Sequence, residues 1–231
     1  MADTLSTSVQ LHPLEPLSAE EIGAAVSIMR RERNLSENVR FVSVTLHEPP
    51  PEVALNFKPG EPVVREAFMV LLDKTNGVGM TYEAIVNISE DKVTSWRHVE
   101  GVQPSIMLEE FFACQEAVKA HPEFQAALAK RGITNLDLVY IDPWSAGNYG
   151  TVEENTRRIL RTTVHVRLNP DDPQENSYAH PVAGLHAVFD LNSMEVIRID
   201  DYGVIPVPQQ PGNYTADSVG PLRTDLKPIS I

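Results

Sequence analysis

Histidine is the residue type that most often binds a metal ion or moves a proton near neutral pH, and this chain has seven histidines. Two imidazoles bind one metal ion when they are spaced as H-x-H, H-x-x-H or H-E-x-x-H. None of these spacings occurs among His12, His47, His98, His121, His165, His180 and His186. The sequence therefore predicts no metal site, and isolated histidines are typical of surface or hydrogen-bonded positions.

Adjacent acidic residues are the next candidates, because two carboxylates can act as general acid and general base. The pairs are Glu20-Glu21, Glu109-Glu110, Glu153-Glu154 and Asp171-Asp172. Neighbouring side chains on a helix diverge by about 100°, so Glu109 and Glu110 should not point together. We therefore interpret these pairs as solvated, with an acid/base pair as the less favoured alternative.

The single cysteine, Cys114, follows three apolar residues in a segment with helical spacing. This position favours a buried structural thiol, and the alternative of a nucleophile would need a histidine nearby in space. No G-x-S-x-G motif, Walker-type phosphate loop or G-x-G-x-x-G motif occurs. We predict no catalytic residue in this chain.

Two segments place aromatic residues where loops are expected. Trp144 directly follows Pro143 in the segment 140–147, and Tyr178 precedes Ala179-His180-Pro181. An aromatic side chain in a loop either packs beneath that loop or forms a contact surface. Spacing alone leaves both interpretations of Trp144 open.

The elements that position these residues follow one pattern twice. In the first half, Ser18-Ala19-Glu20-Glu21 is a capping box that begins a helix extending to about Arg33. Strand spacing follows it at residues 42–46, 65–73, 79–88 and 93–99. Asn76-Gly77 predicts a hairpin between the second and third of these strands.

In the second half, helical spacing returns from Met107 to Ala120, with Phe111, Gln115 and Val118 on one stripe. A further helical piece begins at Pro122 and stops near Gly132. Strands are predicted at 136–141, 159–168, 185–191 and 196–199.

A helix followed by four strands, found twice, predicts an α+β fold. We expect two cystatin-like domains, each a helix packed on a curved four-stranded antiparallel sheet. The predicted boundaries are an N-terminal tail at 1–11, a first domain at 12–101, a second domain at 102–200 and a proline-rich connector at 201–231.

The composition limits the partners of the protein. The chain carries 19 Lys and Arg against 32 Asp and Glu, a formal net charge of −13, so nucleic acid is not an expected partner. No apolar run is long enough to span a bilayer, and residues 1–10 have no secretory pattern. One cysteine fits a reducing compartment, and we expect a cytoplasmic location. A peroxisomal address would lie at a C-terminus beyond residue 231.

Five segments, in the order of the chain, carry a family resemblance. They are His12–Ser18, Asp142–Gly147 (DPWSAG), Ala179–Leu185 (AHPVAGL), Asp201–Pro208 (DYGVIPVP) and Gly220–Ile229 (GPLRTDLKPI). Together they resemble the copper amine oxidases, and the resemblance extends from about His12 to the last residue.

The resemblance implies a homodimeric enzyme that converts a primary amine, with oxygen and water, to an aldehyde, ammonia and hydrogen peroxide. Its copper, its topaquinone cofactor and its aspartate base belong to a large β-sandwich domain that follows two small domains. Asn213-Tyr214 and Asn148-Tyr149 lack the acidic residue of the quinone motif. We therefore expect this chain to be the non-catalytic N-terminal portion, binding neither copper nor quinone, with the connector leading to the catalytic domain.

The resemblance also implies a role for the aromatic segments. In bacterial relatives the second small domain lines the substrate channel, and the matching positions here are Phe111, Pro143, Trp144 and Tyr178. Aromatic rings would desolvate the tail of the amine and attract its ammonium group by about 0.5–2 kcal/mol.

Two other functions are alternatives. A stand-alone cystatin-like binding module is the first, although the Q-x-V-x-G motif of protease inhibitors is not found. An enzyme with a pocket in the curved sheet is the second and ranks lower, because no acid, base or nucleophile signature converges.

Overall fold

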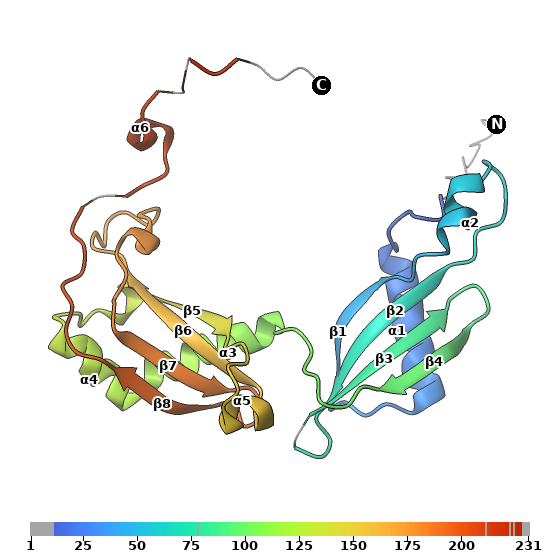
Figure 1. Ribbon diagram of the computed structural model, residues 1–231, viewed down its shortest axis with the longest axis horizontal. Coiled ribbons are helices and arrows are strands. Elements are labelled where there is room, and N and C mark those ends of the chain that lie inside the picture. Colours follow the sequence, from blue (N-terminus) through green and yellow to red (C-terminus); the bar gives the residue numbers. More distant parts are fainter. Residues whose placement is uncertain (1–11, 78, 211, 222, 224, 228–231) are drawn as a thin grey trace, which may run out of the picture. The chain divides into compact units, whose positions relative to one another are not determined.

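A computed structural model describes residues 12–77, 79–210, 212–221, 223 and 225–227. Contacts between residues divide the chain into two units, unit 1 (Met1–Met107) and unit 2 (Leu108–Ile231) (Figure 1). The predicted tail at 1–11 and the last four residues of the predicted connector lie outside the described residues.

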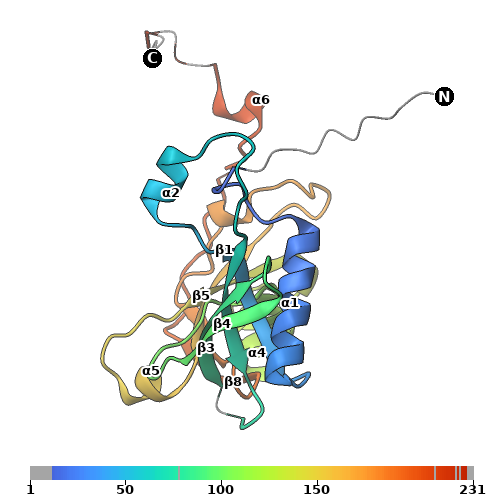
Figure 2. The same cartoon turned by 90° about the vertical axis from the view of Figure 1, so that its right-hand side faces the viewer.

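Unit 1 is one long helix on an antiparallel sheet. Helix α1 (Ala19–Arg33) lies along one face of the sheet, as Figures 1 and 2 both show. The strands, in spatial order, are β1 (Val39–Leu46), β2 (Glu66–Asp73), β3 (Met80–Asn87) and β4 (Lys92–His98). Ala25, Ile28 and Met29 of the helix pack with Met69 and Leu71 of β2 to form the core.

The start of α1 is fixed by the predicted capping box. The Ser18 hydroxyl accepts a hydrogen bond from the Glu21 backbone N–H at 3.2 Å, and Glu21 Oε2 accepts from the Ser18 N–H at 2.8 Å. Arg65, beside β2, donates from Nε to Glu21 Oε1 at 2.7 Å and holds the pKa of this carboxyl below its usual value. One glutamate therefore caps the helix and ties it to the sheet.

The connection from β1 to β2 was predicted only in part. The proline run does end the strand, as expected, but Pro51 then occupies the first turn of a short helix, α2 (Pro51–Asn56), that the sequence analysis missed. The predicted hairpin between β2 and β3 is present, with Asp73 opposite Met80 and Gly77 at a φ of 75° in the turn.

Unit 2 repeats the arrangement with more connecting helices. Helices α3 (Leu108–Ala120) and α4 (Pro122–Lys130) precede a second antiparallel sheet, and α3 packs against β5, β7 and β8. The strands, in spatial order, are β5 (Val139–Ser145), β6 (Ile159–Val166), β7 (Leu185–Asp190) and β8 (Glu195–Asp201). Short elements complete the unit: η1 (Leu136–Leu138), α5 (Val152–Thr156), η2 (Ser177–Ala179) and α6 (Ala216–Val219). The predicted α+β fold with two four-stranded antiparallel sheets is confirmed.

The buried stripe of α3 differs from the predicted one. Glu110, Cys114 and Val118 are buried, at a spacing of four residues, whereas Phe111 and Gln115 are only half-buried. The predicted solvation of Glu110 is wrong, because its carboxylate forms a buried ion pair with Arg158, and both side chains are 5% exposed or less. A charged residue enters a core when a partner of opposite charge meets it there.

The other acidic residues of these pairs also differ in exposure. Glu20, Glu109 and Asp171 are exposed, as predicted. The prediction is wrong for Glu154, whose side chain is 1% exposed and whose Oε2 accepts from the Tyr149 and Thr151 backbone N–H groups. These hydrogen bonds lower the pKa of the Glu154 carboxyl, and the bond from Tyr149 has the largest effect.

Cys114 lies in the core of unit 2, as predicted, with no exposed surface. Burial raises the pKa of its thiol to about 12. We expect the native chain at pH 8 to react with a disulfide reagent such as DTNB only as fast as it unfolds, because the thiolate is the reactive form. The release of thionitrobenzoate, with and without urea, measures this. Rapid stoichiometric release from the native chain would contradict it.

The connector is attached to unit 2 rather than free of it. His180, fully buried, bonds through Nδ1 to the carbonyl of Pro208 at 2.8 Å, and Asn176 Nδ2 donates to the carbonyl of Gly212 at 2.9 Å. A Cβ on Gly212 would lie 2.4 Å from the Cβ of Ala179, so only glycine fits this approach. Figure 1 shows this segment running back along unit 2 after β8.

Candidate functional site

The four residues predicted to line a channel all belong to unit 2 but lie in different environments. Phe111, on α3, is half-buried, and Pro143, on β5, is buried. Trp144, also on β5, is 61% exposed, and Tyr178, on η2, is 51% exposed. The exposed parts of the Trp144 and Tyr178 rings do not contribute to the core and are accessible to a ligand or a partner surface.

Pro143 and Trp144 lie in a strand, so their predicted placement in a loop is wrong. Strand β5 continues to Ser145, and Pro143 pairs with Thr162 of β6. The strand includes a proline because β5 is at the edge of its sheet, where the missing N–H does not interrupt a second ladder.

Strand geometry separates Pro143 from its neighbours. Successive side chains of a strand point to opposite faces, so Tyr140, Asp142 and Trp144 share one face of β5, while Ile141 and Pro143 share the other. Helix α3 packs on the face of Ile141, whose carbonyl accepts from Gln115 Nε2 at 2.5 Å. Trp144 is therefore on the face of the sheet away from α3.

One buried carboxylate joins the two exposed rings. Trp144 Nε1 donates to Asp142 Oδ2 at 2.9 Å, and the Tyr178 hydroxyl donates to the same oxygen at 2.9 Å. The Tyr178 ring also packs against the rings of Tyr140, at 5.7 Å between centroids, and His165, at 4.5 Å. We call these five residues the Asp142 cluster.

The structure thus brings together two of the four predicted residues, and the described contacts join neither of them to Phe111. Instead Phe111 packs edge-on against Phe112, with their centroids 6.0 Å apart. The sequence analysis missed Asp142, Tyr140 and His165. Residues 140, 142 and 144 alternate with residues 141 and 143, which is the spacing of a strand. A predicted strand that continued past Ile141 would have placed Tyr140, Asp142 and Trp144 on one face.

The charge of the Asp142 cluster is carried by its carboxylate. Burial lowers the pKa of His165, against an opposing effect of Asp142, so the imidazole is neutral at pH 7. Burial and the hydrogen bonds to Tyr140 and Asp142 raise the pKa of Tyr178, which therefore stays a neutral donor. Arg161, the cross-strand neighbour of Trp144, already lies 3.4 Å from Glu154 Oε1.

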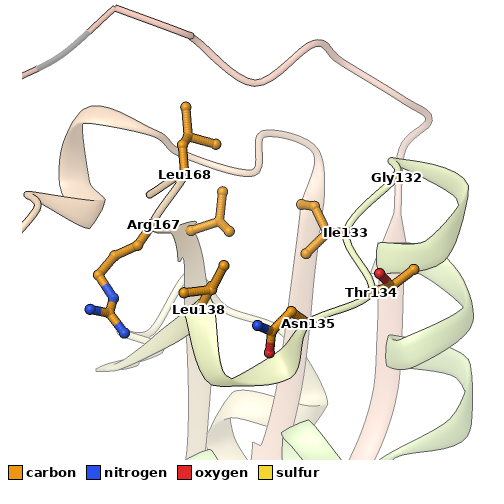
Figure 3. A pocket seen from close by; sticks show the side chains of 8 residues that line it. Gly132, Ile133, Thr134, Asn135, Leu138, Arg167 and Leu168 are labelled. Carbon is orange, nitrogen blue, oxygen red and sulfur yellow. The ribbon is translucent and has the colours of Figure 1, made fainter. Parts of the chain in front are cut away.

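Two open cavities in unit 2 lie away from the Asp142 cluster. One, of about 210 Å³, lies where η1 meets the end of β6. Figure 3 shows Leu138, Leu168 and Ile133 around this space, while the guanidinium of Arg167 extends away from it. The other, of about 250 Å³, lies between α4 and β8. Neither is lined by Phe111, Pro143, Trp144 or Tyr178.

These features define a class: paired small α+β domains, one of which presents a carboxylate-bound aromatic surface. Comparison with protein families gives the particular family. The model of the copper amine oxidase N2 domain matches residues 12–99, and that of the copper amine oxidase N3 domain matches residues 109–217. The chain carries the N2 and N3 domains of the copper amine oxidases and belongs to that family, which confirms the resemblance seen in the sequence.

Individual relatives agree with this assignment. The chain is 43% identical over 221 residues to a primary amine oxidase of Arthrobacter sp. strain P1, covering 95% of this chain and 33% of the relative. It is 34% identical over 260 residues to a copper-containing diamine oxidase of Nicotiana tabacum, covering 95% of this chain and 33% of the relative. The chain thus spans about a third of the length of the curated relatives that it matches.

A solved structure has the same fold. The copper-containing benzylamine oxidase of Hansenula polymorpha superposes with a TM-score of 0.69 at 21% identity, over 96% of this chain and 36% of that chain.

The copper amine oxidase family implies copper and a quinone in full enzymes. In the described part of this chain, no three His, Cys, Asp or Glu side chains lie close enough together to hold a metal ion. These residues do not fit a copper site. Across the same residues, no helix is both long enough and apolar enough to cross a membrane.

Proposed function

We propose that this chain is the N2–N3 portion of a copper- and topaquinone-dependent primary-amine oxidase, and that unit 2 lines the path of the amine. The catalytic β-sandwich domain of the same polypeptide and a second copy of the enzyme are the proposed partners. The observation that supports this role is the pair of exposed rings, Trp144 and Tyr178, bound to one carboxylate.

The chemistry of this surface suits a primary amine, which is a cation at neutral pH. The faces of the Trp144 and Tyr178 rings attract an ammonium group by about 0.5–2 kcal/mol, and the negative charge of Asp142 beneath them adds to that attraction. The apolar ring surfaces also remove water from the tail of the amine. Phe111 and Pro143 remain proposed channel residues, although no described contact joins either of them to the two exposed rings.

The relatives support an amine substrate without fixing which one. Their names specify methylamine, histamine, diamine and N-methylputrescine oxidases, and the solved relative is a benzylamine oxidase. Small and large amines thus occur among proteins similar to this chain. A surface on the approach to the active site discriminates between amine tails without altering the reacting centre.

The test uses the longer enzyme, in which a catalytic copper amine oxidase domain follows this chain. With copper supplied, we expect it to oxidise benzylamine, and we expect Trp144→Ala to lower kcat/KM by about 2- to 30-fold, mainly through a higher KM. Hydrogen peroxide release measures both constants. We expect the change in KM because the cation–π contact and the apolar ring surfaces act on the binding of the amine and not on the chemical step.

Tyr149→Ala is the matched control, because Tyr149 is another aromatic residue of unit 2, is 83% exposed and lies outside the Asp142 cluster. Its kinetic constants should equal those of the parent enzyme. An equal effect of both substitutions would reject the channel role. Absence of amine turnover by the parent enzyme would reject the proposed activity itself.

A further inference from the structure

The two exposed rings of the Asp142 cluster have unequal supports. Tyr178 is held on two sides by the rings of Tyr140 and His165 as well as by its hydrogen bond. Among the described residues no ring pair includes Trp144, whose indole is 61% exposed and is joined to the cluster by its bond to Asp142. An exposed indole without this bond would sample several rotamers.

The acceptor itself is well fixed. Asp142 is 7% exposed and lies in the middle of β5, paired with Thr163 of β6. Both rings donate to Oδ2, so one oxygen sets the position of two donors that are 34 residues apart in the chain. A bond from a neutral donor to a carboxylate is charge-assisted and stronger than one between neutral groups.

We propose that Asp142 is a positioning residue: by accepting from both Trp144 and Tyr178 it holds the Trp144 indole in one orientation and thereby builds the aromatic surface that the amine meets. The bonded side chains lie on the sheet face away from α3, so the role of Asp142 is separable from the core that α3 covers. The link to the amine rests on the proposed function; the orientation of the rings does not.

The orientation is tested on the chain itself by nuclear magnetic resonance of its two indole N–H groups, assigned with Trp96→Phe. In the wild-type chain we expect the Trp144 indole proton to exchange slowly with water despite the exposure of the ring. Asp142→Ala should accelerate this exchange about tenfold or more and move the signal to the position of a free indole. Asp142→Asn keeps an acceptor oxygen and should restore part of the protection.

Asp137→Asn is the control, because it removes the same charge from an exposed position of unit 2. It should leave the Trp144 signal unchanged. An unchanged signal in Asp142→Ala, or no restoration in Asp142→Asn, would overturn the proposal. So would collapse of the backbone amide spectrum in Asp142→Ala, because Asp142 would then be needed for folding rather than for orientation.

The longer enzyme tests the link to the amine separately. If Asp142 acts through Trp144, then Asp142→Ala and Trp144→Ala should raise KM for benzylamine by similar factors, and the double variant should add little more. Both should leave kcat within about twofold. A free indole signal together with an unchanged KM would reject the channel role of the surface while leaving the positioning role of Asp142 intact.

Discussion

Replacing Glu110 with alanine is expected to lower the free energy of unfolding of unit 2 by about 3–5 kcal/mol, because it leaves the Arg158 guanidinium buried without its carboxylate. The two side chains are 2% and 5% exposed, and they join α3 to the start of β6. Urea unfolding followed by hydrogen exchange of the β6 and β7 amides measures this change in unit 2 separately from unit 1.

Two further variants test whether the loss of stability in Glu110→Ala comes from the unpaired charge of Arg158. Glu109→Ala alters the exposed neighbour on the same helix and should change the free energy of unfolding by less than about 0.5 kcal/mol. Glu110→Leu combined with Arg158→Met removes both charges, and it should destabilise unit 2 less than either single change. A double variant that is as unstable as the sum of the single variants would show that the two residues act independently.

Arg131→Met is expected to have the second largest effect and to lower the free energy of unfolding of unit 2 by about 2–4 kcal/mol. The Arg131 side chain is 1% exposed, and Nη2 donates to Asp201 Oδ1 at 2.7 Å and to the carbonyl of Gly203 at 2.5 Å. Methionine fills the same space but leaves these acceptors without their charged donor. Lys130→Met is the control, since Lys130 also approaches Asp201 but has a side chain that is 65% exposed.

The pH dependence of this effect has a definite sign. The hydrogen bond from Arg131 is the main cause that lowers the pKa of Asp201 to about 2. The folded-state pKa is thus below the unfolded value of about 3.9, so this stabilisation is complete above about pH 4 and disappears as the pH falls toward 2. The difference between the parent chain and Arg131→Met should therefore shrink over that interval. A difference that is constant from pH 5 to pH 2 would contradict this assignment.

The fold was predictable because its signals are local. The capping box at Ser18, the hairpin at Gly77 and the period-two spacing of the strands each depend on residues close together in the chain. The buried Glu110 was not predictable from such signals, because its partner, Arg158, is 48 residues away and a glutamate on a helix is ordinarily solvated. Helix α2 was not predictable from the proline run, because proline both ends a strand and fits the first turn of a helix.

Two of the five residues of the Asp142 cluster were predictable from the sequence, but the geometry that joins them was not. Family resemblance gave Trp144 and Tyr178, and the strand pattern of 140–144 contains Asp142. That Tyr178 donates to the same oxygen as Trp144 depends on how the segment after β6 returns to β5, which no short-range pattern encodes.

The connector is attached to unit 2 more through polar contacts than through buried apolar side chains. It is attached through polar bonds from His180 and Asn176, whereas its apolar side chains at Tyr202, Val204 and Ile205 are 74%, 57% and 47% exposed. Little apolar surface would therefore be exposed to water if the part of the connector after Gly203 detached from unit 2. We therefore expect the segment after Gly203 to open in a step smaller than the global unfolding of unit 2.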